Sequence, residues 1–231
     1  MTEISHFGTV GFMLTTLATI WLLFKALKIK KYLLLIILWM LIVSILGLSG
    51  FYRNVDAFPP RFVFLLGPGI LIVLIIFLSK RGKEVMDTLN LKWLTLLHTV
   101  RVPVEIVLYG MFLEGLIPYL MTFEGYNFDI LSGITAPIIY YFTFIKKRID
   151  YKGLLLWNFI CLGLLINVLT IAALSAQTPF QKFAFEQPNI GVIYFPFVWL
   201  PAIIVPIVLF SHLASIKQLL SLKKRKGINN E

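Results

Sequence analysis

Four polar side chains share one face of a single hydrophobic segment, and their types suit the binding of a charged or polar group. His98, Arg101, Glu105 and Tyr109 follow one another at spacings of three, four and four residues. On a helix they fall within an arc of about 80° and over about 16 Å of rise. Arg101 can anchor an anionic or carbonyl group, and Glu105 can supply a counter-charge or accept a proton. The spacing therefore predicts a polar site on one helix face.

The hydrophobic segment that carries this stripe, residues 93–118, is long enough to cross a membrane. A charged residue at the centre of a membrane helix costs roughly 2.5–3.5 kcal/mol on an insertion scale. Such residues usually line a pocket or pathway, or pair with one another. Arg101 and Glu105 lie four residues apart, which allows both interpretations. They form either a structural ion pair that fixes helix packing or a binding site for a ligand.

The composition predicts an integral membrane protein. Its 231 residues are 59% hydrophobic and 14% charged, with a mean hydropathy of +0.89, whereas soluble domains are about 25% charged. Hydrophobic runs of roughly the length of a membrane helix recur along the chain, and the fifth of them is short. The runs cover residues 8–27, 32–51, 62–79, 93–118, 130–145, 153–175 and 190–215. They predict an all-α polytopic membrane protein with seven transmembrane helices.

The basic residues between these runs indicate an orientation. Groups of four or five Lys or Arg follow the first, third, fifth and seventh runs, and the other gaps hold only Arg53, Arg61 and Lys182. Because basic residues stay on the cytoplasmic side, the N-terminus is expected outside and the C-terminus inside. The membrane is expected to be the inner or plasma membrane of the cell. Residues 1–216 would form one seven-helix domain, and residues 217–231 a basic cytoplasmic tail.

A short similarity suggests an internal repeat. The run that begins at Phe62 (FVFLLGP) resembles the run that begins at Phe197 (FVWLP). Two sets of three parallel helices joined by a linker helix would fit this similarity. The segment 93–118 would then be the linker, so that the linker carries the polar stripe.

Loops rich in aromatic and hydrogen-bonding side chains cover the predicted outer side of the bundle. They suggest a vestibule above an outward-opening cavity around the segment 93–118, although an interfacial aromatic belt explains the same composition. We expect His98, Tyr109 and Asn167 to line this cavity together with Arg101 and Glu105. The predicted vestibule consists of Glu124, Asn127, Asp129, Gln181 and Glu186.

Metal and cofactor chemistry has little support in the sequence. The chain has three histidines and one cysteine, Cys161, and these residues do not follow the spacing of a zinc site. His98 and His212 would ligate a haem only if their helices faced each other, so we predict neither a metal nor a cofactor. The sequence shows no catalytic motif of a hydrolase or a phosphate-binding loop, and we predict no catalytic residue.

These observations predict a membrane protein that binds, transports or senses a small molecule. Two alternatives remain open. One is a membrane enzyme that acts on a lipid or isoprenoid at the outer leaflet, with Glu105, Glu114 or Asp129 as acid or base. The other is a non-catalytic subunit whose charges pair with a membrane-protein partner or with a second copy in a homo-oligomer. The expected partners are the lipid bilayer and an unidentified small molecule or lipid. The net charge of +10 lies in the connecting segments and does not indicate nucleic-acid binding.

Overall fold

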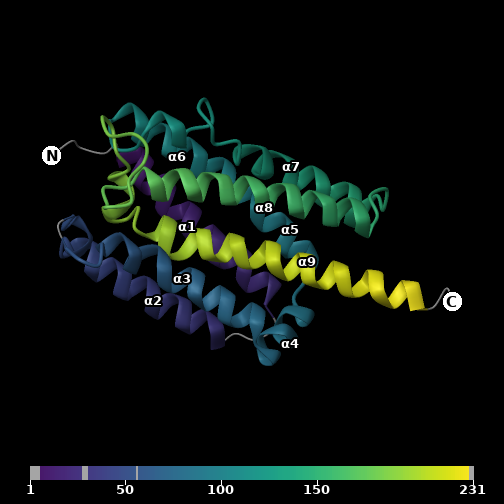
Figure 1. Ribbon diagram of the computed structural model, residues 1–231. Coiled ribbons are helices and arrows are strands. Elements are labelled where there is room, and N and C mark those ends of the chain that lie inside the picture. Colours follow the sequence, from purple (N-terminus) through teal and green to yellow (C-terminus); the bar gives the residue numbers. More distant parts are fainter. Residues whose placement is uncertain (1–5, 28–30, 56, 229–231) are drawn as a thin grey trace.

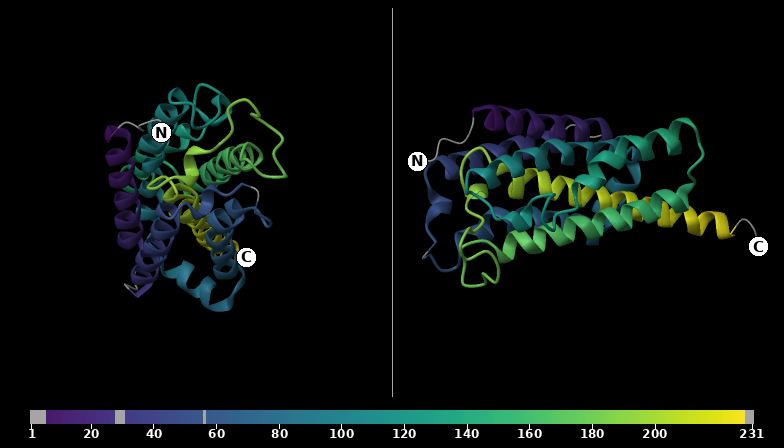
Figure 2. Two further views of the ribbon diagram at one scale, coloured as in Figure 1. Left: turned by 90° about the vertical axis from the view of Figure 1, so that its left-hand side faces the viewer. Right: turned by 90° about the horizontal axis from the view of Figure 1, so that it is seen from above.

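The computed structural model describes residues 6–27, 31–55 and 57–228, and every regular element within them is a helix. The long helices lie roughly along one direction and form a bundle (Figures 1 and 2). Three of the shorter elements extend a longer helix: the 3-10 turn η2 (His98–Val100) and the π-helices η4 (Tyr141–Ile145) and η6 (Leu200–Ile204). The α-helices are α1 (His6–Ala26), α2 (Lys31–Leu48), α3 (Arg61–Leu78), α4 (Lys80–Thr88), α5 (Leu91–Leu97), α6 (Arg101–Leu113), α7 (Ile130–Tyr140), α8 (Tyr151–Leu174) and α9 (Val205–Ile228).

The lengths and compositions of the apolar helices are consistent with a helical membrane protein. Five of the described helices are long and apolar enough to cross a membrane, and two further apolar helices are shorter. The five are Gly8–Ala26, Arg61–Leu78, Leu91–Leu113, Tyr151–Leu174 and Leu200–Leu222, and the shorter two are Tyr32–Leu48 and Ile130–Ile145. Each of the seven overlaps with one of the hydrophobic runs predicted from the sequence.

The helix predicted over 93–118 ends earlier than expected, at Leu113. Gly115 takes a left-handed conformation with φ 77°, which a residue with a side chain rarely adopts. Its N–H donates to the carbonyl of Phe112, and the N–H of Leu116 donates to the carbonyl of Met111. This pair of bonds is the Schellman motif that closes a helix C-terminus. The last residues of the predicted run therefore belong to a loop.

The helix predicted over 190–215 begins about ten residues late, at η6. The N–H groups of Ile190 and Gly191 both donate to the carbonyl of Leu116 in another loop, and the short 3-10 turn η5 (Gly191–Ile193) ends at Tyr194, whose backbone is extended. The polypeptide forms turns up to Trp199, and α9 then continues to Ile228. Most of the predicted tail 217–231 is thus helical, and its residues 229–231 lie outside the described part.

A short helix, α4, was not predicted. Ser79 accepts a hydrogen bond from the N–H of Gly82 at 3.0 Å and so caps its first turn. Lys217 of α9 pairs with Asp87 at 2.6 Å, and Gln218 donates to the carbonyl of Leu89. These contacts fix α4 against the far end of α9. The basic segment after α3 is therefore an ordered helix rather than a plain connection.

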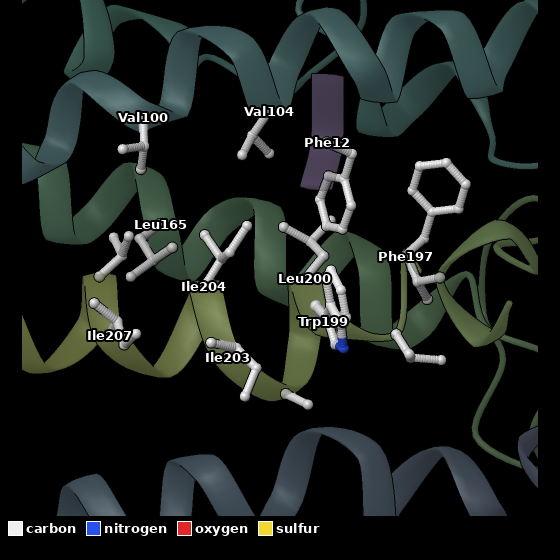
Figure 3. Packing of buried hydrophobic residues seen from close by; sticks show 14 of the residues in the cluster. Phe12, Val100, Val104, Leu165, Phe197, Trp199, Leu200, Ile203, Ile204 and Ile207 are labelled. Carbon is white, nitrogen blue, oxygen red and sulfur yellow. The ribbon is translucent and has the colours of Figure 1, made fainter. Parts of the chain in front are cut away.

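The centre of the bundle is the helix formed by η6 and α9. In its most apolar stretch 72% of the residues are buried, against 17% in that of α3. Figure 3 shows Ile204 of this helix and Val104 of α6 pointing toward each other, with Leu165 of α8 beside them. Ile203 points the opposite way (Figure 3). The two faces of the central helix therefore belong to different parts of the core.

Candidate functional site

Arg101 lies at the start of α6 and is 3% exposed. Its Nη1 donates to Asp129 Oδ1 at 2.7 Å, and the two side chains are only 4% and 6% exposed. A second, longer bond runs from Nη1 to the backbone carbonyl of Cys161 on α8, at 3.4 Å. Arg101 therefore pairs with Asp129, which precedes α7, and not with Glu105.

A glycine on α7 makes this ion pair possible. Gly133 lies one turn after Asp129, and a Cβ atom at this position would lie 2.8 Å from the backbone nitrogen of Val102. The backbones of α6 and α7 are thus in direct contact, which brings Asp129 to the guanidinium. Ser132 also donates to Asp129 Oδ1, at 3.4 Å. Burial raises the pKa of the Asp129 carboxyl, and the Arg101 guanidinium and the Ser132 hydroxyl oppose that shift.

Glu105 is also buried and receives its hydrogen bond from the loop between α6 and α7. Asn127 Nδ2 donates to Glu105 Oε2 at 2.7 Å and to the carbonyl of Met121 at 3.0 Å. Asn127 Oδ1 accepts from the backbone N–H of Asp129 at 3.1 Å. Asn127 and Asp129, predicted as parts of a vestibule, are 0% and 4% exposed. They are the partners of the two charged residues on α6.

The other three predicted vestibule residues do not join this network. Glu124 and Glu186 are exposed. Gln181 donates to the carbonyls of Phe183 and Ala184 within its own loop. None of the three lines the cavity described below.

Two further residues predicted to line the cavity lie elsewhere. Tyr109 stacks on Phe123 of the loop, with ring centroids 4.9 Å apart. Asn167 is on the exposed side of α8 and donates to the carbonyl of Tyr126 at 2.7 Å. Both side chains hold the loop 114–129 against the helices. They were predicted to line the cavity because their side chains are polar, but their positions around α6 and α8 place them outside it.

His98, three residues before Arg101, belongs to a second group of buried polar side chains. Its ring stacks on that of His212 of α9 at 3.8 Å and 15°, and Trp157 packs edge-on at 5.5 Å. His212 Nδ1 lies 3.0 Å from Asn158 Oδ1. Imidazole nitrogens bind metals in the plane of the ring, so two rings stacked face to face do not direct nitrogens at one iron between them. His98 lies outside the cavity that Arg101 lines.

Arg101, Glu105 and Asp129 line a small cavity near the loop end of the bundle, with a volume of about 70 Å³. The fourth polar residue of its lining is Asn189, from the loop between α8 and η6. The remaining lining is apolar and comes largely from α3, α6, α8 and the η6–α9 helix. Sequence reasoning did not single out Asn189, because an asparagine in a loop carries no signal of burial.

Several polar atoms at this cavity lack a partner among the described residues. They are Nε and Nη2 of Arg101 and Oδ1 of Asn189. Asn189 is held in place by Nδ2, which donates to the carbonyl of Ala172 at 3.1 Å. A buried polar group without a partner costs about 1–3 kcal/mol, and more if it is charged. These donors and this acceptor therefore belong to residues that line the cavity, but each atom is itself almost fully buried, so a ligand or water reaches it only after a small shift of the side chains.

Comparison with known proteins identifies a family for this arrangement. No curated protein and no solved structure matches the chain. The model of a family described as a domain of unknown function, DUF8737, matches residues 61–220. This range includes Arg101, Glu105, Asp129 and Asn189, and it leaves out α1 and α2. Because the match covers more than half of the chain, the protein belongs to the DUF8737 family.

Proposed function

We propose that this protein is a multi-pass membrane protein that binds a small polar molecule in the cavity beside Arg101. The unpartnered Nε and Nη2 groups of Arg101 carry this proposal. They belong to a guanidinium that is almost fully buried, at a depth where an unsatisfied donor is costly. A ligand oxygen at this position would remove that cost.

The charges around the cavity limit the chemistry of the ligand. Asp129 already balances the charge of Arg101, and the Glu105 carboxyl also lines the cavity. A neutral oxygen acceptor, such as a carbonyl, therefore suits Arg101 better than a further anion. The free Oδ1 of Asn189 calls for an N–H or O–H donor on the same ligand. The ligand class is thus a small neutral molecule with both groups, such as an amide or a hydroxylated carbonyl compound.

The volume of the cavity limits the size of the ligand. One water needs about 10–15 Å³ of such volume, so about 70 Å³ accepts a few waters or a group of similar size. Met121, Asn189 and Val192 of the two loops form part of the lining. A larger molecule would enter only if these loops moved. Enclosure under loops suits either transport or sensing, both of which need the site to open and close.

We further propose seven crossings with the N-terminus outside, in the inner or plasma membrane of the cell. The alternation of basic segments supports this orientation. The two shorter helices, Tyr32–Leu48 and Ile130–Ile145, are about 24–26 Å long at 1.5 Å per residue. The hydrocarbon core is about 30 Å thick, and modest thinning of the bilayer accommodates such helices.

Native mass spectrometry after mild purification tests the ligand proposal. The test variant is the double change Arg101→Gln with Asp129→Asn, because it removes the cation without leaving a buried carboxylate unpaired. The control is Lys182→Gln, which removes an exposed cation from the loop that carries Asn189. We expect wild type and control to release the same small molecule, and the double variant to release none. Equal retention by the double variant, or no small molecule from wild type, would contradict the proposal.

Cysteine labelling in intact cells tests the orientation. Cys161 is buried and is replaced by alanine to give a background without cysteine. Gln177→Cys lies in an exposed loop at the proposed outer side, and Arg148→Cys lies at the proposed inner side. A membrane-impermeant maleimide should label only the cysteine at position 177. Labelling of position 148 alone would reverse the orientation.

A further inference from the structure

The first part of α2 is only partly buried against the bundle, through Leu33, Ile36, Trp39 and Met40. From Tyr32 to Ile42 no side chain is buried, whereas Val43 and Gly47 are. The contacts of α2 are mainly with η1 (Phe51–Arg53) and η6, both near its C-terminal half. Figures 1 and 2 show α2 at the edge of the bundle. A space therefore remains beside the N-terminal half of α2.

Two indole hydrogen bonds fix the position of α2. Pro206 has no N–H and so cannot donate to the carbonyl of Ala202, four residues earlier. Trp39 Nε1 donates to this carbonyl at 3.2 Å. Trp199 Nε1 donates to Ser44 Oγ at 2.9 Å. Because the membrane interior offers few other partners, α2 cannot move to close the space without the loss of these two hydrogen bonds.

The space is a groove of about 430 Å³ between α1, α2, α3 and α9. Its walls are almost entirely apolar, and they include Leu35, Ile36, Ile72, Ile76, Ile207 and Phe210. Along α3 the lining extends from Gly69 to Ser79. Ten residues of helix correspond to about 15 Å, which is half of the hydrocarbon thickness of about 30 Å. The groove thus has the depth of one leaflet, and its volume suits an acyl chain.

One end of the groove, unlike its apolar walls, is lined by polar and basic residues. Arg81, in the first turn of α4, lines this end together with Ser79 and Gly82. Arg81 is exposed, and the neighbouring Lys80 and Lys83 are exposed as well. A cluster of cations beside an apolar groove complements a molecule with a long chain and a negative head.

We propose that this groove binds one acyl chain of an anionic phospholipid, with the lipid phosphate at Arg81. A second apolar groove, which includes Phe159, Leu162 and Lys217, differs in that its cation is already paired. Lys217 is bound to Asp87 and to the carbonyl of Lys83. The first groove therefore offers a cation to a headgroup, and the second does not.

This lipid site is independent of the cavity beside Arg101. Leu200, Pro201, Ile204 and Val208 line the cavity, whereas Ile203, Pro206, Ile207 and Phe210 line the groove. These positions are two faces of the same helix. The groove can therefore hold a lipid whether or not the cavity holds a ligand.

Native mass spectrometry of the purified protein in mixed micelles tests this proposal. The micelles contain equal amounts of phosphatidylglycerol and phosphatidylcholine with identical acyl chains, and the measured quantity is the ratio of the two lipids retained. A basic residue near a membrane surface contributes about fivefold to the binding of an anionic lipid. We expect wild type to favour phosphatidylglycerol, and Arg81→Gln to reduce this preference about fivefold. Arg148→Gln removes a cation from the α7–α8 connection and should leave the preference unchanged.

A steric pair of variants tests the location of the chain. Ile72→Trp fills the groove, and Ile75→Trp places the same bulk on the lipid-exposed side of α3, outside the groove. Ile72→Trp should lose both lipids, while Ile75→Trp should retain them. The proposal fails if Arg81→Gln keeps the same lipid preference as Arg148→Gln and Ile72→Trp retains as much lipid as Ile75→Trp. It also fails if the retained molecule is a free fatty acid.

Discussion

The ion pair between Arg101 and Asp129 gives the sharpest test of the buried network. The two side chains are 4% and 6% exposed and are joined at 2.7 Å. Arg101→Met would leave Asp129 with the Ser132 hydroxyl as a weak donor at 3.4 Å. Removing one partner of a buried ion pair typically costs about 3–5 kcal/mol, whereas replacing both is often neutral or stabilising. We therefore expect Arg101→Met to cost about 3–5 kcal/mol, and the double variant with Asp129→Leu to cost much less.

The cost of Arg101→Met should also depend on pH. Burial raises the pKa of the Asp129 carboxyl in the folded protein, and the guanidinium now opposes this. Without Arg101, the folded-state pKa rises further above its unfolded value. The folded state then binds the carboxyl proton more tightly than the unfolded state, so the variant gains stability at low pH. It should lose that stability as pH increases from the unfolded pKa through the folded pKa.

Denaturant unfolding in detergent micelles, followed by tryptophan fluorescence, measures both effects. A double-mutant cycle for Arg101 with Asp129 gives their coupling free energy, and a second cycle for Arg101 with Glu105 is the comparison. We expect the first coupling to exceed the second, because no hydrogen bond joins Arg101 to Glu105 in the described structure. A larger coupling to Glu105, or a cost of Arg101→Met below about 1 kcal/mol, would refute the reasoning.

Four further substitutions test the packing with the same unfolding measurement. Gly69→Ala should cost about 1–3 kcal/mol, because its Cβ would lie 2.3 Å from the rigid Pro206 ring, whereas Gly67→Ala meets only Val63 at 3.7 Å and should be neutral or stabilising. A smaller loss for Gly69→Ala than for Gly67→Ala would contradict the close α3–α9 contact. Trp39→Phe should cost about 1–3 kcal/mol because it leaves the Ala202 carbonyl unpaired, and an unchanged midpoint would show that water or lipid replaces the indole. Asp87→Asn should change stability by no more than about 1 kcal/mol, since Asp87 is 54% exposed, and a larger loss would mean that α4 is held mainly by this charge.

The helices could be predicted from hydropathy wherever an apolar run is also a continuous hydrogen-bonded helix. The run 130–145 has the bounds of α7 and η4 together, and Asp129 and Lys146 are the polar residues that limit it. The prediction failed where apolar residues continue beyond the helix. Gly115 ends α6 through its left-handed backbone, and residues 190–199 are mostly apolar but form turns, of which Ile190 and Gly191 bond to another loop. Hydropathy measures the preference of side chains for lipid and does not record where backbone hydrogen bonds go.

The candidate site could be predicted only for the residues on α6 itself. Helical spacing places Arg101 and Glu105 on one buried face, and both are buried and line the cavity. Their partners, Asp129 and Asn127, come from the next helix and its loop, so their identity depends on how α7 packs on α6. Gly133 allows the close contact between α6 and α7. A single glycine in an apolar run can have several structural roles, so this one could not be identified from the sequence. The order of the two charges was a stronger indication that Arg101 and Glu105 do not pair with each other, because a base four residues before an acid pairs poorly on one helix.

The central helix formed by η6 and α9 accounts for the opposite character of the two hollow regions. On one face it packs against α8 and lines the cavity together with α3, α6 and α8, where Arg101 is 3% exposed. On the other face it meets α3 closely at Gly69 and Pro206, and it meets α2 through Trp39. Both contacts depend on Pro206, whose ring packs on Gly69 and whose missing N–H leaves the carbonyl that Trp39 binds. A proline in a membrane helix thus holds α2 at the distance that keeps the groove open, on the face of the central helix opposite the cavity.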